Sequence, residues 1–466
     1  MLPGPPLDVV AIATLLDRAE ALAACGADGA AKRAFVAILQ ADPTHRRALL
    51  GLGALAEAGG FVSAARTAFG QAVQCHPGDA VARLCLARRL GVDDPAAACA
   101  QYRAVLDLPG CAPMHLAEAH LGLARLLEGA AAAAHWRAAG AAPALTRQKF
   151  RGVGPSLPVL LLVSARGGNV PLTDWIDARG FDLVVVQADL LRPGQEMPPH
   201  ALVVNAIGDA DLCGAALRAA RAVLARTDAP VINPADRVLA TGRVDNARRL
   251  GRLPGVVAPP MRAVRRAEIA RAGLAYPLLL RSPGHHTGAH FELVADTQAL
   301  GAALARLPGA VLLAIGFVDA RGADGLVRKY RVMLIDGALY PVHLAIGRHW
   351  KLHYLSADMA DNAAHRAEEA RFLDDMGAVL GPRAIAALGG IGAALGLDYV
   401  GVDFALDADG ALLLFEANAT MAVVQPDADP IWDYRRAAVA AVWQARAAML
   451  WRRLADPARR RREAAA

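Results

Sequence analysis

The sequence has few cysteines, no transmembrane-length apolar run and no recognisable leader. Its six cysteines contain no Cys-x-x-Cys pair and five lie in the first third, so we expect buried reduced thiols rather than disulfides or a metal cluster. The longest strongly apolar run, at 311–318, is far shorter than the roughly 20 residues that span a bilayer. The first ten residues carry prolines where a signal peptide has a charged and then an apolar region. These absences predict a cytoplasmic protein with no membrane partner.

The chain also has little excess charge and almost no lysine. A net charge of +6 over 466 residues argues against a dedicated nucleic-acid binder, which would show basic stripes interleaved with aromatics. The exception is the arginine-rich end, 451–466, which we expect to be a solvated basic tail; contact with RNA or an acidic partner is the alternative. Lysine occurs at only four positions, so a lysine inside a motif is informative.

The first third is rich in alanine and leucine and contains an internal repeat. Small, aromatic and proline positions recur at a period of 34 residues, with a degraded third copy: Ala31, Phe35 and Pro43; Ala65, Phe69 and Pro77; Ala98, Tyr102 and Pro109. Alanines let paired helices approach, the aromatic fills the gap to the next repeat, and proline ends the second helix. This pattern resembles the tetratricopeptide (TPR) repeat and predicts an all-α, TPR-like domain over 1–142.

After a break at about 141–157 the pattern of apolar segments and turn residues changes, and it changes again at about 259. Short apolar runs alternate with helical segments from 157 to 258, which predicts a doubly wound α/β domain. From 259 to 450, strands joined by Asp-Gly turns alternate with helices, which predicts a mixed α+β domain built on antiparallel sheet. We therefore expect a multidomain chain.

The hairpin at 401–418 concentrates polar oxygens at the end of an apolar strand. A two-residue type I′ turn at Asp409-Gly410 places Glu416 opposite Asp403, and Asn418 shares the face of Glu416. Two opposed carboxylates repel unless a cation lies between them, and hard oxygens suit Mg²⁺. A surface hairpin with solvated acids is the alternative, which the apolar neighbours Val402 and Phe404 disfavour.

This arrangement, an Asp followed thirteen residues later by Glu-x-Asn, resembles the metal-binding signature of the ATP-grasp superfamily. The resemblance covers about 157–450: a pre-ATP-grasp domain at 157–258, then an ATP-grasp domain at 259–450 whose two α+β lobes hold ATP between them. It implies that Asp403, Glu416 and Asn418 bind two Mg²⁺ ions, or Mn²⁺, that bridge the ATP phosphates.

The same resemblance assigns the strand and loop at 278–290 to the phosphates. Arg281 stands where the family usually has lysine, and the resemblance implies a catalytic role for it. The loop after it would donate backbone and side-chain hydrogen bonds to ATP from Gly284, His285, Thr287 and Gly288. Zinc binding by His285, His286 and His290 is a weaker alternative, because no further spaced ligand accompanies them.

Further assignments follow along the chain. The lobe connector would present the backbone of Phe317 and Val318 to the purine, although Gly316 replaces a common glutamate. The resemblance implies ATP-binding roles for Asp319 and Lys329, and contact of Arg331 with the transferred phosphoryl group. An acceptor pocket would draw on a polar cluster of His343, Trp350, Lys351 and His353.

The function implied is that of an ATP- and Mg²⁺-dependent ligase. It would form an acyl-phosphate from a small carboxylate and join it to an amine, or less often a thiol, with the repeats recruiting a peptide or protein that carries a substrate. A catalytically degenerate ATP-binding sensor or scaffold is the alternative, for which Arg281 and Gly316 are the evidence. A kinase on the same fold is a third possibility.

Overall fold

The computed structural model describes residues 8–455 except 25, 59–60, 92, 128, 149, 153–154, 171–175, 177–178, 193, 285–289, 353 and 355–356. The chain forms two compact units. Unit 1 comprises Met1–Ser156 and Ala178–Asp182, and unit 2 comprises Leu157–Asp177 and Leu183–Ala466. His285, Thr287, Gly288 and His353, which the sequence assigns to the site, lie outside the described residues.

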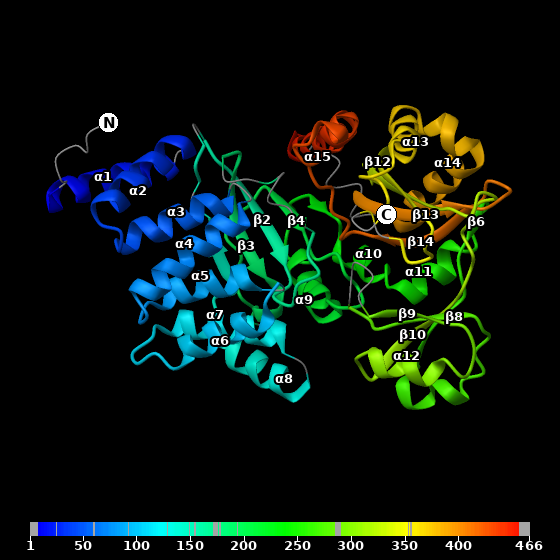
Figure 1. Ribbon diagram of the computed structural model, residues 1–466, viewed down its shortest axis with the longest axis horizontal. Helices are drawn as coiled ribbons and strands as arrows, with labels where there is room; N and C mark the ends of the chain where they lie inside the picture. Colours follow the sequence, from blue (N-terminus) through cyan, green and yellow to red (C-terminus); the bar gives the residue numbers. More distant parts are fainter. Residues whose placement is uncertain are drawn as a thin grey trace. The chain divides into compact units, whose positions relative to one another are not determined.

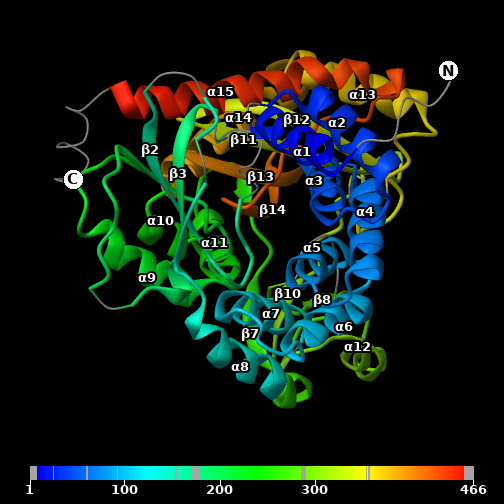
Figure 2. The same cartoon turned by 90° about the vertical axis from the view of Figure 1, so that its left-hand side faces the viewer.

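Unit 1 is a succession of helices, as the sequence predicts. Each helix packs on the next one along the chain, and Figure 2 shows them following one another in sequence order. Their bounds are α1 (Val9–Ala24), α2 (Asp28–Ala41), α3 (Arg46–Ala58), α4 (Val62–Cys75), α5 (Ala80–Leu90), α6 (Pro95–Leu106), α7 (Pro113–Leu126) and α8 (Gly129–Ala138). The helical character of this region is confirmed, and its assignment as TPR-like stays a prediction.

The aromatic residues of the sequence repeat pack against glycines. Phe35, Phe69 and Tyr102 are all buried. A Cβ atom added to Gly51, Gly53 or Gly122 would lie 2.4, 2.4 or 2.2 Å from the ring of Phe35, Phe69 or Tyr102, respectively. Each ring therefore lies directly on the backbone of a neighbouring helix, which only glycine permits.

Gly53→Ala is expected to destabilise unit 1 by about 1–3 kcal/mol, because the new methyl group would overlap the buried Phe69 ring. Gly70→Ala, in α4, is the matched control, since nothing lies within 4 Å of its added Cβ. There alanine is expected to stabilise the helix by about 0.5–1 kcal/mol. Hydrogen exchange of the α3 and α4 peptides, read by mass spectrometry, reports both changes locally. Equal protection in the two variants would contradict the packing described.

Unit 2 contains part of a sheet, with neighbouring strands in the order β3-β2-β4-β5, and the first two residues of β3 belong to unit 1. The strands are β2 (Leu157–Val163), β3 (Phe181–Gln187), β4 (Leu202–Asn205) and β5 (Val231–Ile232). β4 pairs in parallel with both β2 and β5, as expected for a doubly wound region. The helices that follow are α9 (Gly214–Leu224), α10 (Ala235–Leu239) and α11 (Arg243–Leu250).

Unit 2 contains two further sheets (Figure 1). One has the order β7-β10-β8-β9, with strands β7 (Met261–Arg265), β8 (Leu278–Arg281), β9 (Phe291–Val294) and β10 (Val311–Gly316). Its neighbours all pair antiparallel, and α12 (Leu300–Arg306) contributes to the core beneath it.

The other sheet has the order β12-β11-β13-β14-β6. Its strands are β6 (Val256–Val257), β11 (Val327–Ile335), β12 (Ala338–Gly347), β13 (Tyr399–Leu406) and β14 (Leu412–Asn418). The helices that contact it are α11 and three later ones, α13 (Ala363–Asp374), α14 (Met376–Leu395) and α15 (Arg436–Ala455). β11, β12, β13 and β14 pair antiparallel, as predicted, whereas the short β6 joins β14 in parallel.

The predicted pairing of Asp403 with Glu416 is confirmed, but the predicted turn is wrong. The hairpin closes through a three-residue loop, 408–410, in which the Gly410 N–H donates to the carbonyl of Asp407 at 3.1 Å and Gly410 has φ +72°. Near the loop Phe404 pairs with Leu414, and a β-bulge then shifts the register so that Asp403 pairs with Glu416. The bulge at Phe415 thus restores the pairing that a two-residue turn would have produced.

Two features at the helical end of unit 2 depart from expectation. The predicted tail at 451–466 begins inside α15, where Arg452 and Arg453 form ion pairs with Asp336, so these arginines are part of the fold. Among the described residues one helix, α14, has the length and apolar composition to cross a membrane. Its backbone leaves the helical conformation at Gly381 (φ 75°, ψ 167°), so no continuous helix runs its whole length.

Candidate functional site

A cavity of about 660 Å³ in unit 2 is lined by strands of its second and third sheets and by segments that follow β2 and β4 of the first sheet, including the start of α11. Most of the described residues that the sequence assigns to the site line it: Arg281, Phe317, Val318, Lys329, Arg331, Trp350, Lys351, Asp403, Glu416 and Asn418. Gly284, Asp319 and His343 are not among the lining residues. The hairpin and the basic strand, predicted separately, therefore share one cavity.

Asp403 is held by two cations from the neighbouring strand. β11 pairs with β13 so that Arg331 lies opposite Asp403, and Lys329 reaches the same carboxylate because alternate residues of a strand share a face. Arg331 donates from Nε and Nη2 at 2.6 and 2.8 Å, and Lys329 Nζ lies 2.7 Å away. Burial would raise the pKa of Asp403, but Arg331 and Lys329 outweigh it and hold the pKa well below its usual value.

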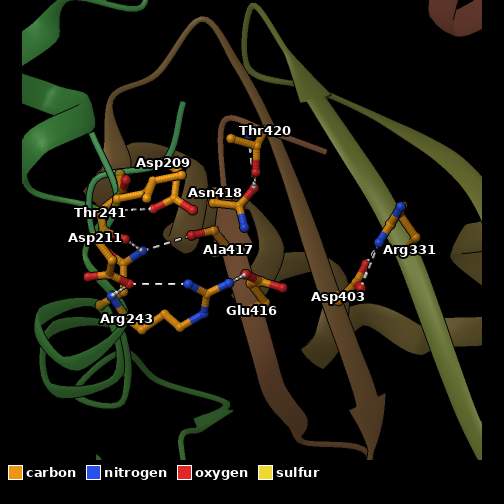
Figure 3. Close-up of polar contacts among 12 residues, drawn as sticks. Asp209, Asp211, Thr241, Arg243, Arg331, Asp403, Glu416, Ala417, Asn418 and Thr420 are labelled. Atoms are coloured by element: carbon orange, nitrogen blue, oxygen red, sulfur yellow. Dashed lines mark hydrogen bonds and ion pairs between the residues drawn. The ribbon is translucent and has the colours of Figure 1, made fainter. Parts of the chain in front are cut away.

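Glu416 is paired with a residue that the sequence did not single out. Arg243, the first residue of α11, donates from Nη2 to Glu416 Oε1 at 2.5 Å and from Nη1 to Asp211 Oδ2 at 3.2 Å (Figure 3). Burial favours a raised pKa for Glu416, yet Arg243 and Arg281 together hold it below the ordinary value. No local pattern marks Arg243, because it lies 173 residues before its partner.

The side-chain oxygen of Asn418 is hydrogen-bonded within the loop that follows β14. Its Oδ1 accepts hydrogen bonds from Thr420 N at 2.9 Å and Thr420 Oγ1 at 2.8 Å (Figure 3). The following loop lies against the first sheet, since a Cβ on Gly208 would come within 2.6 Å of the Thr420 methyl group. Gly208 is therefore needed where the Asp209–Asp211 segment meets the end of β14.

The basic residues are balanced by acids within the cavity. Four carboxylates line it, Asp209, Asp211, Asp403 and Glu416, together with five cations, Arg243, Arg281, Lys329, Arg331 and Lys351. Arg281 lies over the Phe291 ring, 5.4 Å from its centroid. Burial and the neighbouring Arg243 lower the pKa of Arg281 below its ordinary value. Anions that enter would therefore meet guanidinium groups already in place.

Part of the cavity lining is apolar and aromatic. Ile315, Phe317 and Val318 line it from β10 and the connector that follows. A Cβ at Gly316 would lie 2.9 Å from Pro260 Cγ, so close packing excludes a larger residue at this position. Trp350 packs edge-on against Phe291 and Phe317, with ring centroids 5.2 and 6.4 Å apart.

Three residues that the sequence assigns to the site make contacts with other parts of the protein. Asp319 is paired with Arg321, which donates from Nε to both carboxylate oxygens at 2.9 and 3.0 Å. His343 is buried beside Tyr354, with ring centroids 4.6 Å apart, and burial and Arg331 lower its pKa well below the ordinary value. Lys351 Nζ donates to the carbonyl of Phe291 at 3.1 Å, so it ties the loop after β12 to β9. The neutral His343 suits a packing role behind Arg331.

The predicted metal ligands do not form a ready-made cation site. Asp403 is taken by Lys329 and Arg331, Glu416 by Arg243, and the oxygen of Asn418 by Thr420. In the described part of the chain no group of three or more His, Cys, Asp or Glu side chains could hold a metal ion. Arginine and lysine from β11 and α11 neutralise the two carboxylates in this arrangement, and the assignment of Asp403, Glu416 and Asn418 as metal ligands stays a prediction.

The chain was compared with protein-family models, curated proteins and solved structures, and only solved structures match it. No protein-family model and no curated protein matches the chain. Among solved structures it is similar to the RimK domain protein ATP-grasp from Sphaerobacter thermophilus, at 21% identity and TM-score 0.37, covering 62% of this chain and 98% of that one. It is also similar to the VanG D-Ala:D-Ser ligase from Enterococcus faecalis, at 14% identity and TM-score 0.36, covering 62% and 100%. A third is N5-carboxyaminoimidazole synthetase from Staphylococcus aureus complexed with ADP, at 12% identity and TM-score 0.38, covering 59% and 73%. Similarity at this level carries no conclusion about the activity of this chain.

Proposed function

We propose that unit 2 is an ATP-dependent ligase of the ATP-grasp type that activates a carboxylate and joins it to an amine or, less often, a thiol. The observation that carries this proposal is the cross-strand pair Asp403–Glu416, held among Arg243, Lys329 and Arg331 in a cavity that is also lined by apolar and aromatic residues. A triphosphate suits the charged residues and a purine suits Phe317 and Val318. This combination of charged and apolar lining favours a nucleotide as the occupant.

The proposed chemistry proceeds in two transfers. A carboxylate oxygen of the substrate attacks the γ-phosphorus of ATP, the bond to the bridging oxygen breaks, and ADP leaves. The acceptor nitrogen then attacks the acyl carbon, phosphate leaves with the carbon–oxygen bond pair, and the nitrogen gives up a proton to solvent. Arg331 and Lys329 stabilise the charge as it shifts, and because Asp403 fixes them beforehand they need no reorganisation at that moment.

Mg²⁺ enters this proposal as the counter-ion that accompanies ATP. Both carboxylate oxygens of Asp403, Oε1 of Glu416 and the side-chain oxygen of Asn418 are engaged by protein donors, so these side chains do not fit a resident ion in this arrangement. No step is assigned to a metal held by the protein alone.

Unit 1 has a separate proposed role, which is to recruit a peptide or protein that carries one of the substrates. The helices that follow one another along unit 1, with repeated aromatic–glycine contacts, support it.

Glu416→Ala is expected to lower ADP release by about 10²-fold or more, since it removes one of the two acidic partners of Arg243 and one carboxylate from the cavity. The measurement is ADP release by the full chain with MgATP and pooled amino acids or peptides. Asp245→Asn, an exposed acid on α11, is the matched control and should behave as wild type. Turnover unaffected by Glu416→Ala would remove the support for a ligase.

A non-catalytic ATP sensor or scaffold is the second candidate. Its support is that every predicted metal ligand is engaged within the protein and that Arg281 stands in the usual place of lysine. ATP binding by the wild-type chain without ADP release in the presence of any acceptor would favour this candidate over the ligase.

A further inference from the structure

The Arg243–Glu416 pair blocks the carboxylate that the sequence presents as a metal ligand. Arg243 Nη2 lies 2.5 Å from Glu416 Oε1, and the arginine side chain is only 9% exposed. The same guanidinium reaches Asp211 Oδ2 at 3.2 Å, so it bridges two acids that line the cavity (Figure 3). Its Nε atom is buried and has no hydrogen-bond partner.

The position of Arg243 is fixed by its helix. The Arg243 N–H donates to Asp211 Oδ2 at 3.3 Å. One turn further along α11, Asn246 Nδ2 donates to the carbonyl of Ala417 at 2.8 Å and to that of Thr241 at 3.0 Å. Because Ala417 directly follows Glu416, α11 is tied to β14 at the point where the ion pair forms. The pair is therefore built into the fold, unlike a surface contact between two flexible side chains.

A divalent cation at Glu416 would meet positive charge on two sides. Arg243 occupies one carboxylate oxygen, and the positive charge of Arg281 also acts on Glu416. Like charges repel more strongly in a partly buried site than in water. Asp403 offers no alternative, since it is 1% exposed and already pairs with Lys329 and Arg331.

We propose that Arg243 takes the place of a divalent cation at Glu416 in the nucleotide-free protein, so that metal reaches this carboxylate only together with an anionic nucleotide. The first half concerns the chain by itself. The second half rests on the proposed function, because a triphosphate is the anion that would give Arg243 another partner and release Glu416.

The test is titration of the nucleotide-free full chain with Mn²⁺ at low salt, with the free ion followed by electron paramagnetic resonance. Wild type is expected to take up Mn²⁺ weakly, and Arg243→Met to bind it about tenfold more tightly or better. The gain should vanish in Arg243→Met/Glu416→Gln. Arg248→Met, an exposed arginine on the same helix, is the matched control and should match wild type.

Two results would overturn the proposal: Mn²⁺ binding by wild type as tight as by Arg243→Met, or a gain that persists without Glu416. Should Arg243→Met fail to fold by circular dichroism, wild type and Glu416→Gln decide instead. Equally weak Mn²⁺ uptake by wild type and Glu416→Gln supports the proposal, and tighter Mn²⁺ uptake by wild type overturns it.

Calorimetry with ATP, with and without Mn²⁺, tests nucleotide binding separately. If ATP does not bind, the proposed function fails while the Mn²⁺ result for Arg243→Met still stands.

Discussion

Asp403→Ala is expected to lower ADP release by about 10²–10³-fold and to destabilise unit 2 by about 3–5 kcal/mol. Asp403 is 1% exposed and is the shared partner of Arg331 and Lys329. Its removal leaves two partly buried cations facing each other without a counter-charge, so both the fold and the position of the phosphate-binding groups suffer. Denaturant unfolding followed by tryptophan fluorescence and the ADP assay measure the two effects.

Asp409→Ala is the control for this experiment. It removes a carboxylate from the same hairpin at its exposed tip, and a change within about 0.5 kcal/mol is expected. A stable Asp403→Ala variant with normal unfolding would show that Arg331 and Lys329 do not depend on this carboxylate, contrary to the geometry described.

Glu369→Ala is expected to cost about 3–5 kcal/mol in the free energy of unfolding of unit 2. Glu369 on α13 is fully buried and accepts hydrogen bonds from Tyr434 Oη at 2.6 Å, Tyr354 Oη at 3.0 Å and Leu344 N at 3.2 Å. It also lies 3.4 Å from Arg435 Nε, and that guanidinium stacks over Tyr354 at 4.3 Å. Alanine would leave Arg435 buried without its carboxylate and three donors without an acceptor.

Glu369→Gln separates charge from hydrogen bonding at this position. Burial raises the pKa of Glu369 although Arg435 and Tyr434 oppose it, so the ionised form is held at a cost. Glutamine keeps one acceptor and is expected to lose about 1–3 kcal/mol, less than alanine. Equal losses in the two variants would mean that packing alone accounts for the role of Glu369. Glu368→Ala on the same helix, paired with Arg328 and partly exposed, should have a smaller effect than Glu369→Ala.

Local patterns predicted the parts of the site that lie close together in the sequence. Lys329 and Arg331 are two residues apart in a strand, so both are expected on one face of the sheet, and both do reach the same carboxylate. The helical first third and the antiparallel strands after 259 were also predictable, because periodicity reflects which face is buried.

What could not be predicted depends on contacts between distant segments. Asp403 meets Arg331 across 72 residues, and Glu416 meets Arg243 across 173. From the hairpin alone, two acids face each other with no visible counter-charge, and a metal is the reasonable inference. The cations that neutralise them come from a neighbouring strand and from a helix of the preceding sheet region, and no spacing rule connects these to the hairpin.

The bulge at Phe415 has a consequence for comparing this hairpin with those of other chains. In an antiparallel hairpin without a bulge, a loop with an odd number of residues puts even differences between paired positions. The pairs next to the three-residue loop obey this, such as Leu406 with Leu412, whereas Asp403 and Glu416 differ by thirteen. The difference between paired residue numbers changes from even to odd at the bulge. The register next to the loop therefore does not by itself determine which residues pair beyond the bulge. Consider a chain whose loop has one residue fewer and whose hairpin has no bulge. The sequence separation of its two acids would be two residues smaller, and it would still be an odd number. Parity combined with loop length is therefore a better guide than a fixed spacing when this pair is sought in another sequence.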